Sequence, residues 1–319
     1  MFAKARYNSG MKILIFGAGV MGSVYAAKLA QSGESVTILA RGKRLRQLKQ
    51  NGIILKHFYS DKQTTTHVNV VKTLNPNDAY DVIAVHVRRT QLESALPLLA
   101  RNKKAPTILV MVNNATSVKN LADKIGKERL VLGFPCAGGG MEKDGKVVYA
   151  IAPGFSQKTT IGELNGSETY RVKTLVEMYR KAGFPAAVST NIQAWLKTHL
   201  VFILPICAAL LKYKGDNHAL ANDDSLLTHV VKGFKEGLNV LKTLRIPITP
   251  SRVNIFFGLP SPLLFLFIKL WIGSGDGEVF FSYHVRASAD ENYFLIDEFT
   301  KLIEQSKVDT PSLNKLFSR

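Results

Sequence analysis

The stretch Lys12-Ile-Leu-Ile-Phe16-Gly17-Ala-Gly-Val-Met-Gly22 decides the fold of this chain. Its first residues are typical of a buried strand, and the glycines at 17, 19 and 22 follow at once. Residues 23–32 then carry apolar side chains at helical spacing, and Ser35–Leu39 (SVTIL) is a second predicted strand. In this setting GxGxxG indicates a dinucleotide site, because its glycines allow a tight turn, a close pyrophosphate and close helix packing. A tight turn without a ligand is the alternative.

The residues after the second strand bear on the choice of cofactor. NAD sites usually carry an acidic residue there, which binds the ribose 2′-hydroxyl. Here the strand is followed by Ala40 and then by Arg41-Gly-Lys-Arg44, so a guanidinium stands where a 2′-phosphate needs a bidentate partner. We therefore expect NADPH/NADP on the loop Gly17, Ala18, Gly19, Val20, Met21 and Gly22. A solvated, basic helix start is the alternative.

Strand and helix patterns alternate through the first half of the chain. Further strands are predicted at residues 68–71, 81–85, 107–111, 130–134 and 147–151. Such alternation favours a parallel sheet with crossover helices. After about residue 190 the pattern becomes helical, with long periodic stretches at 192–211, 225–244 and 287–306. We expect an α/β protein with an N-terminal extension (1–10), a Rossmann-type parallel-sheet domain (11–190) and an all-α domain (191–319).

Composition excludes several classes of protein. A chain of 319 residues with 46% hydrophobic residues can bury a large core. Cys136 and Cys207 cannot form a disulfide framework and match no zinc motif, so we expect a reducing, cytoplasmic setting and no metal. The longest apolar runs, 200–211 and 263–268, are shorter than the roughly 20 residues of a spanning helix, so no stable membrane insertion is expected.

The charge balance favours anionic partners. There are 42 Lys and Arg against 24 Asp and Glu, a formal net charge of +18. The basic residues form no aromatic-interleaved strip and no zinc-finger-like unit, so we do not expect a nucleic-acid partner. A small anionic molecule is the expected partner.

Six stretches, taken in order, resemble the ketopantoate reductase (2-dehydropantoate 2-reductase) family. They are ILIFGAGVMG at 13–22, TILARG at 37–42, ILVMVNN at 108–114, IGE at 161–163, AWLK at 194–197 and VDTPSLNKLF at 308–317. The resemblance runs from Met11 to the C-terminus and implies a Rossmann domain followed by a helical one. It also implies NADPH-dependent reduction of a 2-keto acid, of the ketopantoate-to-pantoate type that serves pantothenate biosynthesis, with the substrate between the domains.

The resemblance assigns roles to particular residues. Hydride delivery to a ketone builds negative charge on oxygen, so a proton donor must stand beside it. Lys197 matches the family's general acid, and Asn113 its asparagine for nicotinamide ribose or substrate. Arg41 matches the 2′-phosphate arginine, and Arg88 stands where a lysine near the adenosine phosphates is common. A surface lysine, a turn asparagine and an exposed Arg88-Arg89 pair are the alternatives.

Two further residues are candidates for substrate contact. Glu291 lies twenty residues before Pro311, the spacing that the family shows for its substrate-site glutamate. His284 lies seven residues before Glu291, which places both on one face if a single helix covers them. A His/Glu pair could orient a hydroxy acid or exchange a proton. A solvated helical face is the alternative.

The chain also departs from the family pattern. Family asparagines after the lysine are replaced by Val201 and by the Leu204-Pro205 region, the serine before the glutamate by Val279 with Ser282 nearby, and a glycine by Asn114. A site without these polar groups rejects polar substrates. Beside the reduction of a ketopantoate-type 2-keto acid, two alternatives therefore stay open: a divergent reductase of a more apolar carbonyl substrate and, in another class, a non-catalytic NADPH-binding sensor or interaction protein.

Residues 255–272 are dense in large apolar side chains. We expect them in the core or in a subunit interface, with a homodimer as one form of the latter. A pocket for a bulky substrate and a transient membrane-surface contact are the alternatives.

Overall fold

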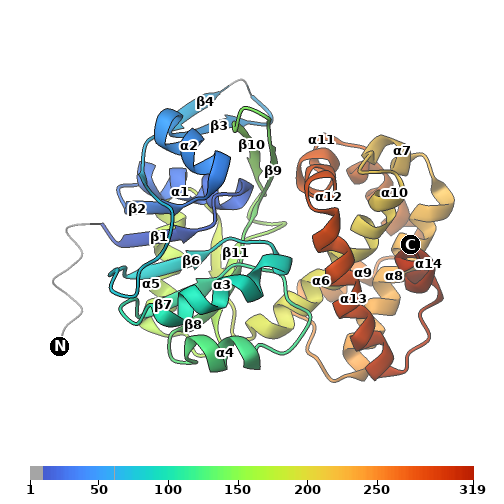
Figure 1. Cartoon of the computed structure of the whole chain (residues 1–319). Helices are drawn as coiled ribbons and strands as arrows, with labels where there is room; N and C mark the ends of the chain where they lie inside the picture. The colour runs from blue at the N-terminus through green and yellow to red at the C-terminus, as the bar shows by residue number, and fades with distance from the viewer. Residues whose placement is uncertain (1–9, 61) are drawn as a thin grey trace. The chain divides into compact units, whose positions relative to one another are not determined.

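A parallel sheet organises the first half of the chain and helices make up the second, as the computed structural model in Figure 1 shows. The structure describes residues 10–60 and 62–319, so the predicted extension, apart from Gly10, lies outside the described residues. The strands are β1 Lys12–Phe16, β2 Ser35–Leu39, β3 Ile53–His57, β4 Gln63–Thr66, β5 Asn69–Val71, β6 Val82–Val85, β7 Thr107–Val110, β8 Leu130–Phe134, β9 Ala137–Met141, β10 Val147–Ile151, β11 Thr159–Glu163 and β12 Ala186–Val188. The helices are α1 Val20–Gln31, α2 Gly42–Asn51, α3 Arg89–Arg101, α4 Lys119–Ile125, α5 Tyr170–Lys181, α6 Ile192–Lys212, α7 Asn217–Ala221, α8 Asp224–Thr243, α9 Arg252–Phe257, α10 Ser261–Ile272, α11 Gly275–Gly277, α12 Tyr283–Ala287, α13 Ala289–Ser306 and α14 Pro311–Phe317, with a π-helical turn at Glu278–Ser282.

The main sheet has the strand order β12-β11-β8-β7-β6-β1-β2-β5. Its pairs are parallel from β5 through β8, and β11 runs antiparallel to β8. Strand β1 lies between β2 and β6, with Phe16 in register with both Leu39 and Val85. The connections leave β1 in opposite directions, which makes the carboxyl ends of β1 and β6 the place where open α/β sheets bind ligands.

Alternate side chains of the strands pack against helices on the two faces of this sheet. Ile13 and Ile15 of β1 join one buried cluster with side chains of α1, α5 and the second sheet. That second sheet has the order β4-β3-β10-β9. Helices α3 and α4 contact each other on the remaining side of the main sheet (Figure 1). The predicted parallel sheet with crossover helices is confirmed.

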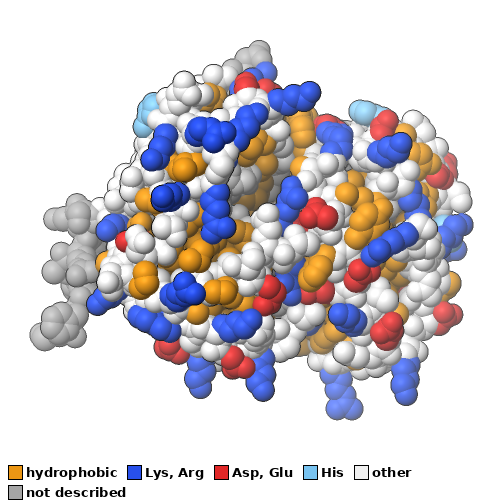
Figure 2. Space-filling view, viewed as in Figure 1, with side chains coloured by type: hydrophobic (Ala, Val, Ile, Leu, Met, Phe, Trp, Pro, Cys, Tyr) orange, Lys and Arg blue, Asp and Glu red, His pale blue; other side chains and the backbone are white. Residues whose placement is uncertain are grey.

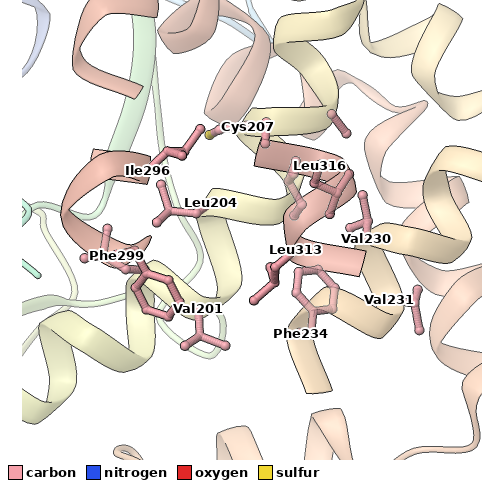
Figure 3. Packing of buried hydrophobic residues seen from close by; sticks show 14 of the residues in the cluster. Val201, Leu204, Cys207, Val230, Val231, Phe234, Ile296, Phe299, Leu313 and Leu316 are labelled. Carbon is pink, nitrogen blue, oxygen red and sulfur yellow. The ribbon is translucent and has the colours of Figure 1, made fainter. Parts of the chain in front are cut away.

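The helical half has its own core, shown in Figure 3. Side chains from α6, α8, α13 and α14 meet there, and Cys207 of α6 lies level with Ile296 of α13 while Val201 lies level with Phe299. Helices α6 and α13 are therefore antiparallel. Gly237 of α8 faces Val201, and a Cβ on this glycine would lie 2.9 Å from the valine Cγ1, so the absence of a side chain lets α6 and α8 approach closely.

Helix α6 is long and apolar enough to cross a membrane, the only such helix among residues 10–60 and 62–319. Of its most apolar window, 72% is buried within the protein, which is what the central helix of a folded domain requires.

The chain divides into two compact units. The first comprises residues 1–112 and Val118–Ile192, and the second comprises Asn113–Ser117 and Gln193–Arg319. The five-residue loop after β7 thus packs with the helical unit, and Ala115 is fully buried in its core. The domain expected from the sequence, residues 11–190, includes this loop and therefore differs from the observed division.

Candidate active site

The glycine loop has the geometry that a dinucleotide needs. Gly17 has φ +117°, and a Cβ there would lie 2.4 Å from the carbonyl oxygen of His86. A Cβ on Gly22 would lie 1.9 Å from the carbonyl oxygen of Gly17. A Cβ on Gly19, by contrast, would meet nothing within 4 Å. The outer two glycines are therefore required by packing, while the middle one faces open space where a pyrophosphate can approach the backbone.

Helix α1 begins at Val20, three residues before the start expected from the sequence. Gly19 is its N-cap, and no side chain caps it. The first turn, Val20-Met21-Gly22, carries no acidic residue, so its backbone N–H groups and the positive end of the helix dipole are available to an anion.

Arg44 holds this loop in place, a role that sequence reasoning missed. Its Nε donates to the carbonyl of Ala18 (3.2 Å), its Nη2 to the hydroxyl of Ser23 (2.9 Å) and its Nη1 to the carbonyl of Gly145 (2.7 Å). Burial lowers the pKa of this guanidinium. The loop, the first turn of α1 and the β9–β10 turn are thus fixed by one side chain. The sequence carried no sign of this, because Arg44 sits in a basic run that resembles a solvated helix start.

Arg41 lies at the carboxyl end of β2 as the N-cap of α2 and is exposed to solvent. Its guanidinium makes no hydrogen bond or ion pair within the described part of the chain. Lys43, by contrast, donates to the carbonyl of Lys143 at 3.1 Å, and Gln47 donates to that of Asp144 at 2.9 Å. Of Arg41, Lys43 and Arg44, Arg41 is therefore the one whose side chain has no internal partner within the described residues.

The residues after β6 lie beside the glycine loop. His86 is buried against Tyr25 of α1, with ring centroids 4.9 Å apart. Burial lowers the pKa of His86 to about 3, so the imidazole stays neutral under the loop. Arg88 is half-buried and caps α3, with its backbone N–H donating to Oε1 of Gln91 at 3.3 Å. This places Arg88 at the carboxyl edge of the sheet, as expected.

Asn113 belongs to the loop that packs with the helical unit. It is buried, and its Oδ1 has no hydrogen-bond partner in the structure. Asn114 accepts from the backbone N–H and the hydroxyl of Thr116, at 3.1 and 2.9 Å, and so closes the turn that follows. Asn114 therefore shapes this loop with its side chain, where the family pattern has a glycine.

Glu298 of α13 anchors the same loop. This carboxylate is 4% exposed and accepts the backbone N–H of Ala115 at 3.4 Å. Sequence reasoning missed it, although Glu298 shares the helical spacing of Leu295 and Leu302, and an acidic residue on that apolar face was a usable signal.

Lys197 lies in the second turn of α6 and is half-buried. Its ammonium has no hydrogen bond or ion pair within residues 10–60 and 62–319, and burial lowers its pKa. His199, two residues further on, is neutral because burial lowers its pKa to about 3, and it stacks on Trp195. Lys197 thus has the properties of a proton donor: a lowered pKa and no internal partner.

Glu291 does not lie beside Lys197. It is buried in the first turn of α13 near Cys207, whose pKa is raised to about 12 by burial and further by this carboxylate. Cys207 is ten residues beyond Lys197, about 15 Å along α6. His284 is half-buried in α12, and the helix breaks at Ser288 (φ −144°, ψ 43°), so the single helix expected to align His284 with Glu291 is interrupted.

The positions that depart from the family pattern lie in the core. Val201 and Leu204 are 1% and 0% exposed, respectively, within the packed helices of Figure 3. Ser282 is fully buried, and its hydroxyl has no hydrogen-bond partner in the structure. Within the described residues, no group of three His, Cys, Asp or Glu side chains could hold a metal ion.

Comparisons with known proteins agree with this arrangement. Residues 13–166 match the family ketopantoate reductase PanE/ApbA. The 2-dehydropantoate 2-reductase of Pyrococcus horikoshii is 28% identical over 239 residues, 72% of this chain and 73% of the relative. That of Archaeoglobus fulgidus is 30% identical over 189 residues, 58% of this chain and 59% of the relative.

Solved structures show the same fold along nearly the whole chain. D-mandelate dehydrogenase in a ternary structure with NADH and anilino(oxo)acetate gives a TM-score of 0.75 at 18% identity, covering 96% of each chain. The 2-dehydropantoate 2-reductase of Porphyromonas gingivalis gives 0.70 at 16% identity, covering 97% of this chain and 98% of the other. The expected fold class, a Rossmann-type domain followed by helices, is confirmed. Over residues 13–166 the chain matches the ketopantoate reductase family, and its similarity to several 2-dehydropantoate 2-reductases supports a divergent member of that family of oxidoreductases.

Proposed function

We propose that this protein reduces a 2-keto acid with NADPH in the cytoplasm. The observation that carries the proposal is the glycine loop at the switch point of the sheet, where Gly19 faces open space and Arg41 follows β2 with a free guanidinium. Loop N–H groups hold the pyrophosphate, Arg41 the 2′-phosphate, and Arg88 the adenosine phosphates. When bound, the reduced nicotinamide supplies the hydride.

Lys197 donates the proton in this proposal. Reduction places negative charge on the carbonyl oxygen, and a nearby ammonium stabilises that charge and then transfers its proton. The lowered pKa of Lys197 favours this transfer. Asn113 adds a neutral hydrogen-bonding group, whose unpartnered Oδ1 accepts a hydrogen bond from a hydroxyl of the nicotinamide ribose or of the product.

The substrate proposed here is more apolar than ketopantoate. Val201 and Leu204 are buried among other apolar side chains, so they offer no hydrogen bond to a polar substrate. Glu291 lies near Cys207, which is about 15 Å along α6 from Lys197, so it does not act on the reacting atoms in this proposal. It and His284 are proposed to contact the distal part of the substrate.

The test is NADPH oxidation with ketopantoate and with bulkier acids such as 2-ketoisocaproate and phenylpyruvate. Each is measured with the native chain and with Lys197→Ala. Larger kcat/KM for the bulky acids, lost in the variant, is expected. Activity of Lys197→Ala equal to that of the native chain would refute the lysine mechanism. NADPH binding without turnover of any acid would support a sensor instead.

A further inference from the structure

The outer face of helices α9 and α10 presents a row of apolar side chains to solvent. On α10, Leu263, Leu266, Phe267 and Leu270 follow the spacing of one helical face, and Leu263, Leu266 and Leu270 are 58%, 52% and 66% exposed. Ile255 of α9 is 75% exposed, and the residue after it, Phe256, packs against Phe267 of α10. We call these five residues the apolar row.

The opposite face of α10 is apolar as well. Leu264, Ile268 and Ile272 are fully buried in the helical core. A surface helix of a soluble protein normally has one apolar face, and a helix that is apolar all round is normally covered. The sequence-based expectation of a core or interface segment therefore holds for one face only, and the apolar row needs an occupant.

Aromatic side chains pack beneath and beside the apolar row. Phe267 packs edge-on against Phe256 with ring centroids 5.3 Å apart, and Trp271 stacks on Phe202 of α6 at 5.7 Å. The indole Nε1 of Trp271 donates to Asp276 at 3.3 Å. The apolar row is thus presented by packed aromatic side chains rather than by a loose segment.

The segment that carries the row is basic. Between Glu236 and Asp276 the sequence has no carboxylate, whereas it has Lys242, Arg245, Arg252 and Lys269. Lys235 at the same face donates to the hydroxyl of Ser261, the first residue of α10, at 2.7 Å. Lys269 is paired with Asp224 at 2.6 Å. The net positive charge of this segment therefore comes from the remaining lysines and arginines.

A hollow of about 340 Å³ adjoins the row between α8 and α9. Lys235, Lys242, Asn239 and Asn254 supply donors to it, and Leu238 and Phe257 form its apolar part. Two ammonium groups and two amides are suited to a phosphate ester, and the apolar part to its hydrocarbon neighbours.

We propose that this face docks on an anionic phospholipid surface, with the apolar row in the interfacial layer and a headgroup phosphate in the hollow. A second copy of the chain fits less well. In a two-fold contact the same patch meets itself, so Lys235 and Lys242 would face like charges, while Asp224, the carboxylate at α10, is already paired with Lys269. Negative headgroups complement these lysines instead.

The test is co-sedimentation of the full chain with vesicles of phosphatidylcholine, alone or mixed with phosphatidylglycerol. The native chain should bind the mixed vesicles at least about tenfold more tightly, and high salt should weaken that binding. Leu263→Gln/Leu266→Gln/Leu270→Gln and Lys235→Gln/Lys242→Gln should each lose binding while keeping the native Tm and NADPH affinity. Lys103→Gln/Lys104→Gln, which removes the same charge from exposed positions of the first unit, is the matched control.

Three results would overturn the proposal. The first is equal binding to neutral and anionic vesicles, or none to either. The second is an equal loss of binding in the Lys103/Lys104 control, which would show unspecific attraction to net charge. The third is a dimer in sedimentation velocity that the leucine variant dissociates while vesicles bind nothing, which would make the occupant a second copy.

Discussion

Two arginines near the glycine loop should have separable effects on cofactor binding. Arg41 is free to meet a 2′-phosphate, which only NADPH carries, whereas Arg44 fixes the loop that both cofactors use. Arg41→Ala should raise the Kd for NADPH roughly ten- to hundredfold and leave the Kd for NADH unchanged. Arg44→Ala should raise both constants by a similar factor. Fluorescence titration with the two cofactors measures this.

A third arginine of α2 provides the control for these two substitutions. Arg46 lies on the same helix and is exposed, with no hydrogen bond within the described residues, so Arg46→Ala should change neither constant. Selective loss of NADPH affinity in Arg44→Ala, with NADH unaffected, would contradict the role given to Arg44.

The lowered pKa of Lys197 leads to a pH prediction. The ammonium is the proton donor, and it is present below its pKa and lost as pH rises through that value. The kcat for keto-acid reduction should therefore fall on the alkaline side, at a pH below the ordinary lysine pKa. In Lys197→Arg, whose guanidinium keeps its proton, kcat should be lower and this alkaline fall absent. A native profile identical in shape to that of Lys197→Arg would exclude Lys197 as the titrating group.

At the scale of elements, the junction of β1 and α1 offers a matched pair of substitutions. A Cβ on Gly22 would collide with the carbonyl of Gly17, whereas a Cβ on Gly19 would point into open space. Gly22→Ala should therefore lower the free energy of unfolding by about 2 kcal/mol or more. Gly19→Ala should fold with native stability but bind NADPH at least about tenfold more weakly, because the methyl group occupies the pyrophosphate position. Thermal unfolding of both variants measures the change in stability, and cofactor titration measures the change in NADPH affinity.

The contact between α13 and the loop after β7 should also be measurable. Glu298→Ala leaves the buried N–H of Ala115 without an acceptor, so the free energy of unfolding should fall by about 1–3 kcal/mol. Glu304→Ala, an exposed position on the same helix, is the control and should change stability little. Equal denaturant midpoints for the two variants would show that the contact contributes nothing.

An element could be predicted from the sequence when its own residues carry the pattern, and was missed when the element depends on distant partners. Strands β1, β2, β6, β7 and β8 were found because each is a short apolar run. Strands β4 (QTTT) and β9 (AGGGM) were not, since polar and glycine-rich segments become strands only through partners such as β3 and β10. The helix predicted at 287–306 begins at Ala289, so a single helix does not cover both His284 and Glu291.

The candidate site divides in the same way. The glycine loop and Arg41 were predictable because strand, turn and helix lie within thirty residues of sequence. The clamp by Arg44 depends on Gly145, 101 residues away, and the anchoring of Ala115 depends on Glu298, 183 residues away. Contacts of this separation are fixed by the fold and leave no mark on either local segment.

The whole molecule carries a net charge of +18, and on the face that Figure 2 shows, Lys and Arg side chains are scattered rather than gathered in one strip. A field of this sign accelerates the approach of a polyanion, and salt screens it. The association rate for NADPH should therefore fall clearly between low and physiological salt, while that for the less charged NADH falls less. Stopped-flow fluorescence measures both, and identical salt slopes would show that the field plays no part.

The contact between the buried Ala115 and Glu298 also restricts where recombination within the gene can yield a folded protein. The chain passes between its units at residues 112/113, 117/118 and 192/193, so the second unit is encoded in two separate pieces of the gene. A recombination at residue 192 would join one lineage's loop to another lineage's helices and separate the backbone N–H of Ala115 from its acceptor, the Glu298 carboxylate. The two halves of the coding sequence are therefore expected to evolve as one block, and chimaeras between distant relatives should transfer residues 113–117 together with the helical part.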